Sequence, residues 1–103
     1  MTIGNALAEV ATAETPFKVL FQHGTLEVEM YKPDKVDNQT PHTRDEVYIV
    51  ASGAGTFING GERHEFETGE LLFVPAGVEH RFVDFTDDFS TWVIFYGPEG
   101  GEG

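Results

Sequence analysis

The sequence contains no cysteine among its 103 residues. This absence excludes disulfide bonds, thiolate metal ligands, CxxC redox chemistry and a cysteine nucleophile. Any metal ion bound by this chain must therefore be held by nitrogen and oxygen atoms.

Basic residues and long apolar runs are also scarce. Six Lys and Arg stand against 18 Asp and Glu, giving a formal charge of −12 that would repel phosphate backbones and anionic lipids. No apolar run approaches the roughly 20 residues of a bilayer span, and the first residues lack the basic start and apolar stretch of a secretory signal. We therefore expect no nucleic-acid or membrane partner and a cytoplasmic location.

The chain length suits one compact domain, which we divide into three parts. Residues 1–15 form an Ala-rich N-terminal arm in which Leu7 and Val10 lie three apart. This arm is expected to form one or two helical turns or to lie on a neighbouring subunit, and the sequence leaves both alternatives open. Residues 16–97 form the folded body, and the Gly-, Pro- and Glu-containing residues 98–103 read as a flexible tail.

The folded body has the pattern of an all-β protein. Short runs rich in Val, Ile, Phe, Tyr and Thr are separated by Gly, Pro and Asn-Gly, and Asn59-Gly60-Gly61 predicts a tight hairpin. Eight strands at this spacing favour a jelly roll or a closed barrel over an open sheet. The predicted strands are 17–22, 25–31, 46–51, 55–58, 63–67, 71–74, 79–85 and 89–96.

One stretch resembles the first sequence motif of the cupin superfamily, in which His-x-His is followed by three or four residues, Glu, six residues and Gly. Here His42 matches the second His, Glu46 the Glu and Gly53 the Gly. The position of the first His is occupied by Thr40, with Gln39 directly before it.

A second stretch resembles the other cupin motif, in which Gly, Pro, Gly, His and Asn recur at fixed spacing. Gly69, Pro75, Gly77 and His80 are in register, and Asp84 stands where Asn is usual. The similarity spans residues 39–84. It implies a small, single-domain, metal-binding cupin with an RmlC-like, cupin-type jelly-roll β-barrel over residues 16–97.

The two motifs also predict a metal site. Side chains alternate along a strand, so His42 and Glu46 share one face if the segment between them is extended, and His80 opens another strand after a turn. Two imidazoles and one carboxylate suit one divalent ion of Fe, Mn, Zn, Ni or Co, and the sequence does not choose among these metals. Three protein ligands leave positions for water or substrate.

The identity of a fourth ligand stays open. We expect the amide oxygen of Gln39 to be a better donor than the hydroxyl of Thr40. Because Glu46 neutralises one charge of a divalent ion, the site keeps net positive charge and should favour a small anionic molecule.

Three further residues are predicted to bind that molecule. Tyr48 and Phe82 have the strand parity of Glu46 and His80, so we expect them to form pocket walls. Arg44 is a candidate clamp for a substrate carboxylate.

Other polar residues are expected to be exposed. His23 and His64 adjoin predicted turns, and Asp45 and the Glu27/Glu29 pair are interpreted as solvated face charges.

These features favour a metal-dependent enzyme acting on a small anionic molecule, with dioxygenase chemistry slightly ahead of isomerase or decarboxylase chemistry. No residue beyond the ligands is a convincing general base in the sequence. The alternative is a non-catalytic small-ligand binding or sensing module, and a structural or storage role has weaker support. A homodimer is predicted, with residues 17–22 and the arm as its contact.

Overall fold

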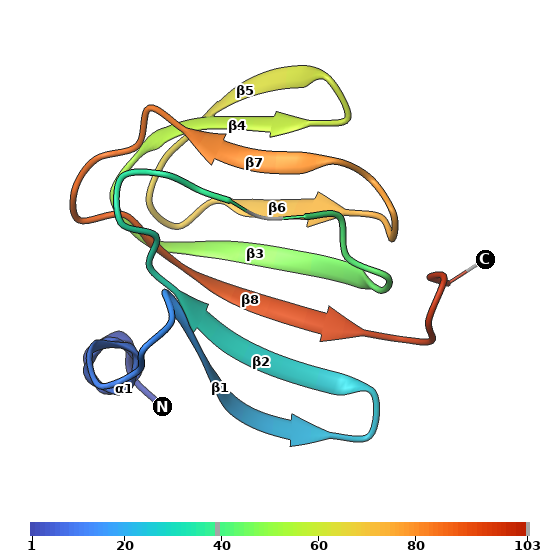
Figure 1. The fold of residues 1–103 in the computed structure, drawn as a ribbon, viewed down its shortest axis with the longest axis horizontal. Coiled ribbons are helices and arrows are strands. Elements are labelled where there is room, and N and C mark those ends of the chain that lie inside the picture. The colour runs from blue at the N-terminus through green and yellow to red at the C-terminus, as the bar shows by residue number, and fades with distance from the viewer. Residues whose placement is uncertain (39, 103) are drawn as a thin grey trace.

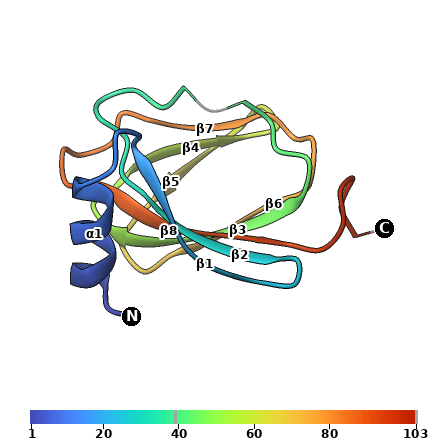
Figure 2. The ribbon, with the colours of Figure 1, turned by 60° about the horizontal axis from the view of Figure 1, so that its bottom comes forward.

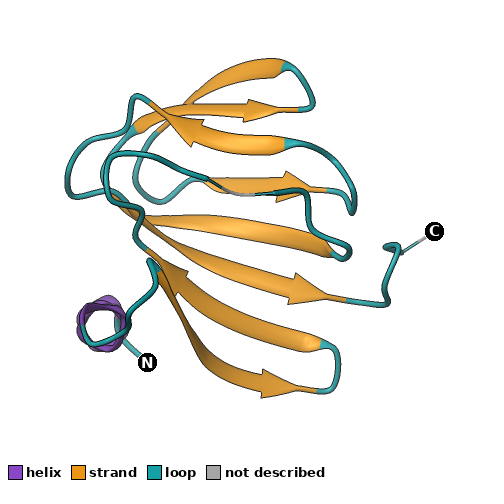
Figure 3. Cartoon of the chain, in the orientation of Figure 1, coloured by secondary structure: helices purple, strands orange, loops and turns teal. Residues whose placement is uncertain are grey.

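The computed structural model describes residues 1–38 and 40–102. One helix, α1 (Ile3–Ala11), precedes eight strands (Figures 1 and 3). The strands are β1 (Phe17–His23), β2 (Leu26–Tyr31), β3 (Asp45–Ser52), β4 (Gly55–Asn59), β5 (Glu62–Phe66), β6 (Leu71–Val74), β7 (His80–Val83) and β8 (Ser90–Tyr96).

The strands form two sheets whose paired strands all run antiparallel. One sheet has five strands in the order β1-β2-β8-β3-β6, and the other has three in the order β5-β4-β7. Figure 2 shows the two sheets facing each other. The chain passes repeatedly from one sheet to the other, so the predicted all-β jelly roll is confirmed.

The predicted strands match the observed strands to within two residues at each end. The predicted hairpin is also present, because Asn59 pairs with Glu62 across Gly60 and Gly61, whose φ angles are 60° and 92°. Two consecutive positive φ angles are the requirement of a two-residue turn whose twist matches that of the strands.

The helix covers the outer face of the five-stranded sheet. Its first turn is capped by Thr2, whose hydroxyl accepts a hydrogen bond from the Asn5 N–H at 3.1 Å. The buried residues Ala6 and Val10 pack against Met30 of β2 and a cluster of neighbouring apolar side chains. Of the two alternatives left open for the arm, the structure shows the helical one.

Aromatic side chains fill one end of the space between the sheets. The ring of Phe82 lies 4.7 Å from the rings of both Phe57 and Phe89, and 5.4 Å from that of Phe66, centroid to centroid. All four residues are buried. Because this end is closed by apolar packing, polar groups inside the barrel gather at the other end.

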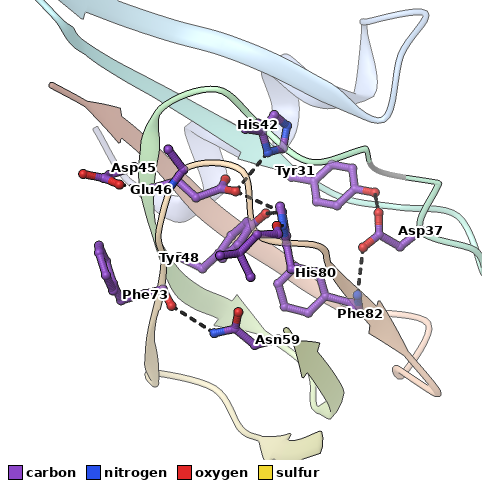
Figure 4. A network of polar contacts seen from close by, with 12 residues as sticks. Tyr31, Asp37, His42, Asp45, Glu46, Tyr48, Asn59, Phe73, His80 and Phe82 are labelled. Carbon is purple, nitrogen blue, oxygen red and sulfur yellow. Dashed lines mark hydrogen bonds and ion pairs between the residues drawn. The ribbon is translucent and has the colours of Figure 1, made fainter. Parts of the chain in front are cut away.

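The segment between β2 and β3 is anchored by Asp37, a buried carboxylate. The Tyr31 hydroxyl donates to Asp37 Oδ1 at 2.6 Å, and the Phe82 N–H donates to Oδ2 at 2.8 Å (Figure 4). Burial, together with the Asp37 contact, raises the pKa of Tyr31. Asp37 therefore ties β2 to β7 across the two sheets.

Asp45 connects the start of β3 to the end of the chain. Its carboxylate accepts hydrogen bonds from the backbone N–H groups of Ala76 at 2.9 Å and Glu102 at 2.8 Å, and its side chain is only 5% exposed. The bond from Glu102, followed by that from Ala76, lowers the pKa of Asp45. The expectation that Asp45 is a solvated charge is wrong, because its carboxylate is buried. One of its partners lies 57 residues further along the chain, so the residues near Asp45 in the sequence do not reveal the contact.

No helix within residues 1–38 and 40–102 is both long enough and apolar enough to cross a membrane.

Candidate metal centre

Three sequence-predicted ligands converge inside the open end of the barrel. Glu46 points inward from β3 and is completely buried, His80 begins β7, and His42 precedes β3 (Figure 4). Their donor atoms all lie within 4.8 Å of one another. The structure therefore brings together residues from two distant stretches of the sequence.

One carboxylate oxygen sits between the two imidazoles. Glu46 Oε1 lies 2.9 Å from His42 Nδ1 and 2.9 Å from His80 Nε2. The other ring nitrogen of His80, Nδ1, lies 2.9 Å from the carbonyl oxygen of Val78, to which it donates. Such a bond to the backbone fixes the ring orientation and leaves Nε2 as the ligating atom, an arrangement common around protein-bound metals.

The geometry of this group fits a bound cation. With its Nδ1 proton donated to Val78, a neutral His80 would present a lone pair to the Glu46 carboxylate, so the contact requires a proton or a metal ion between them. Glu46 Oε2 is buried and has no hydrogen-bond partner among the residues the structure describes. A buried carboxylate oxygen without a partner is costly, and a metal ion would satisfy it.

The electrostatics of the group support the same interpretation. Burial acts to raise the pKa of Glu46, but contacts with His42 and His80 outweigh it and lower that pKa below its ordinary value. Burial acts to lower the pKa of His80, yet the hydrogen bonds to Glu46 and Val78 raise it. A negative charge is thus held inside the barrel because positive or polarised nitrogen atoms face it.

Tyr48 and Phe82 lie beneath the three ligands. The Tyr48 hydroxyl is 3.0 Å from His80 Nε2, and its ring packs 4.9 Å from that of Phe82. Both side chains are buried. Their role as pocket walls stays a prediction, because the adjacent cavity is lined by other residues.

That cavity has a volume of about 600 Å³ and lies on the inner side of β2 and β8. His42 lines it, as do Glu27 and Glu29 of β2 and Phe95 of β8. The expectation that Glu27 and Glu29 are solvated face charges is wrong, since both are only partly exposed and line this cavity.

Arg44 also lines the cavity. Its guanidinium donates to the carbonyl oxygen of Thr25 and lies 5.7 Å from the centroid of the Phe95 ring. Thr40 is on the cavity wall as well. Gln39, the predicted fourth ligand, falls outside the described residues, so that assignment stays a prediction.

The other two histidines lie away from the centre, as predicted. His23 ends β1 and is exposed, and His64 of β5 pairs with Glu70 on the outside of the barrel.

Comparison with known proteins agrees with this fold. A family model described as a cupin domain matches residues 27–95, which include all three candidate ligands. An uncharacterized protein of Streptomyces coelicolor is 34% identical over 94 residues, covering 89% of this chain and 90% of the relative.

Two solved structures show the same fold at low sequence identity. A cupin-2 domain containing protein from Shewanella frigidimarina superposes with a TM-score of 0.74 at 17% identity, covering 94% of each chain. KdgF from a Halomonas species superposes with a TM-score of 0.70 at 21% identity, covering 81% of this chain and 78% of its own. With the jelly roll and the family match in agreement, this chain belongs to the cupin superfamily.

Proposed function

We propose that the protein is a cupin that holds one divalent metal ion at His42, Glu46 and His80 and uses it to act on a small molecule. The observation that carries this proposal is the buried Glu46 carboxylate, which faces two imidazoles with one oxygen and lacks a described partner for the other. Two nitrogen donors and one oxygen donor suit Fe, Mn, Zn, Ni or Co.

The residues around the site define what a bound ion would do. When bound, the ion would act as a Lewis acid or redox centre toward a substrate oxygen. The Val78 carbonyl oxygen orients His80 by accepting a hydrogen bond from its Nδ1, and Asp37, five residues before His42, accepts hydrogen bonds from Tyr31 and Phe82. One carboxylate leaves a divalent ion with net positive charge, which supports the predicted preference for an anionic group such as a carboxylate or enolate.

The donor set favours some reaction classes over others. A set of two His and one carboxylate is typical of non-haem Fe(II) oxygenases, so dioxygenase chemistry is favoured slightly over isomerase or decarboxylase chemistry. The alternative is a binding or sensing module that takes up the small molecule without turnover. Oxygen uptake by the Fe(II)-loaded protein with a panel of small acids and carbonyl compounds distinguishes dioxygenase chemistry from the other proposals.

Metal analysis tests the proposal directly. Protein purified without a His tag should carry about one divalent ion per chain by plasma mass spectrometry, and it should regain one after chelation and reloading. A value below about a tenth of an ion per chain in both preparations would contradict the proposed function.

We further propose a homodimer. Three large apolar side chains on the edge strands are well exposed: Phe21 of β1 (51%), and Leu71 (60%) and Phe73 (45%) of β6. Light scattering should give twice the 11.4 kDa mass of the chain, and a mass near that of one chain would contradict a dimer. The cytoplasmic location and the lack of nucleic-acid and membrane partners stay predictions.

A further inference from the structure

A pair of acidic side chains lies on the cavity wall opposite the metal centre. Glu27 and Glu29 are two residues apart on β2, so they point to the same face, and both line the cavity that His42 also lines. In the sheet, Glu27 is opposite Phe95 of β8, which is opposite Glu46 of β3. Glu27, Phe95 and Glu46 thus form one row across three neighbouring strands.

The length of this row sets the size of a molecule that would contact both Glu27 and Glu46. Neighbouring strands are about 4.8 Å apart, so the backbones of Glu27 and Glu46 are separated by roughly 10 Å. The ring of Phe95 lies between them and packs 4.9 Å from the ring of His42. A molecule resting on Phe95 therefore reaches both ends when it is about the size of a monosaccharide, whereas formate or acetate is too short.

The chemistry of the acidic pair selects hydroxyl groups. Burial and a hydrogen bond to Glu27 raise the pKa of Glu29 to about 8, so near neutral pH the Glu29 carboxyl group holds a proton beside the Glu27 side chain. Such a pair can both donate a hydrogen bond to a hydroxyl group and accept hydrogen bonds from hydroxyl groups.

Charged groups fit this wall poorly. A carboxylate or phosphate at the far end of a ligand would meet the negative charge of the Glu27/Glu29 pair and of Glu99, which lines the same cavity. The guanidinium of Arg44 lines the same cavity, lies over the Phe95 ring and interacts electrostatically with Glu29, so a positive charge of the protein already faces these carboxyl groups. The far end of the ligand is therefore polar and uncharged.

We propose that Glu27 and Glu29 recognise the hydroxyl-rich end of a small polyhydroxylated substrate whose other end presents an anionic oxygen to His42, Glu46 and His80. The assignment of that second end rests on the proposed metal function. The hydroxyl-binding wall depends only on residues of β2 and β8 and is tested separately.

Three acids of equal carbon number test the inference on the wild-type protein. D-gluconate has one carboxylate and a hydroxyl-rich end, D-glucarate has a carboxylate at each end, and hexanoate has one carboxylate and no hydroxyl group. By isothermal titration calorimetry, we expect D-gluconate to bind at least about tenfold more tightly than either of the others, the effect of one charge-assisted hydrogen bond. Equal affinities for D-gluconate and D-glucarate, or for D-gluconate and hexanoate, would overturn the inference.

Variants then assign the selectivity to the acidic pair. In Glu27→Gln and in Glu29→Gln, the preference for D-gluconate over hexanoate should fall about fivefold or more, while the metal content stays that of the wild type. Glu65→Gln is the matched control, since Glu65 is exposed on β5 in the other sheet. An unchanged preference in both cavity variants would overturn the inference.

The metal analysis separates the two possible failures. A protein without bound ion that still prefers D-gluconate over hexanoate, with dependence on Glu27 and Glu29, would contradict the metal function and support the hydroxyl-binding wall. A protein with one ion per chain but no such preference would contradict the wall and leave the metal function standing.

Discussion

The two ends of the barrel interior are built on the same strands but are stabilised in different ways. At the closed end, Phe66, Phe82 and Phe89 pack against one another, and no charge needs a partner there among the described residues. At the open end, Glu46 is equally buried but depends on contacts with His42 and other polar groups. This difference indicates that the closed end contributes mainly to stability and the open end to the proposed metal binding. Mutations at the two ends should therefore affect these two properties separately.

The largest expected effect is on stability, at the closed end. Phe89 is completely buried, and its ring contacts those of Phe66, Phe82 and Phe85 at 4.7–5.2 Å. Phe89→Ala should lower the free energy of unfolding by about 3–5 kcal/mol through lost burial and a cavity. Urea denaturation in EDTA measures this change.

The same variant also tests whether the two ends are independent. Folded Phe89→Ala, or the milder Phe89→Leu where the alanine variant does not fold, should still bind one metal ion with wild-type affinity. A loss of metal affinity parallel to the loss of stability would show that the two ends act as one unit.

The next effect is on metal affinity, at the open end. Glu46→Gln removes the only carboxylate among the three proposed ligands, so metal affinity should fall by about 100-fold or more. This loss exceeds that expected when a residue that only orients a ligand is removed, which is about 10- to 100-fold. Competition with a chelating dye measures the affinity. His64→Ala is the control, because His64 pairs with Glu70 on the barrel surface and is likewise a histidine beside a glutamate. Equal losses in both variants would refute the assignment.

The eight strands and the candidate ligands could be predicted from the sequence because their signals are local. Short runs of β-prone residues between turn residues predicted the eight strands, and the two cupin motifs pointed to His42, Glu46 and His80 without knowledge of strand order.

The cavity wall could not be predicted because it depends on which strands are neighbours. Glu27 is near the metal centre only because β2 pairs with β8 and β8 pairs with β3, which joins residues far apart in sequence. The burial of Asp45 has the same origin, since it depends on the N–H group of Glu102. On an isolated strand, such carboxylates cannot be distinguished from solvated charges.

A smaller effect is expected for Asp37, which contacts Phe82 of the closed end and lies five residues before His42 of the open end. Asp37→Ala leaves the Tyr31 hydroxyl and the Phe82 N–H without that acceptor, so the free energy of unfolding should fall by roughly 2 kcal/mol. Metal affinity should fall severalfold as well, because Asp37 anchors the segment that carries His42. Asp34→Ala, in the same segment but exposed, is the control. Stability lost with metal affinity unchanged would show that His42 is positioned without Asp37.

The smallest effect is a pH dependence that only the open end should have, because Glu29 is partly exposed and solvent screens its interactions. Burial, then the contact with Glu27, raises the pKa of Glu29 from its ordinary 4.5 to about 8, with a further contribution from Glu46 and an opposing one from Arg44. Between these two values the Glu29 carboxyl group of the folded chain holds a proton that the unfolded chain has released, so the contribution of Glu29 to the free energy of unfolding should fall as the pH rises from about 4.5 to about 8. Glu29→Gln removes this contribution, so its stability relative to the wild type should rise across that interval and stay level outside it. Urea denaturation in EDTA at a series of pH values measures the difference. Glu65→Gln should follow the wild type, and a Glu29→Gln curve parallel to the wild type would show that the Glu29 carboxyl group carries no proton in the folded protein at neutral pH.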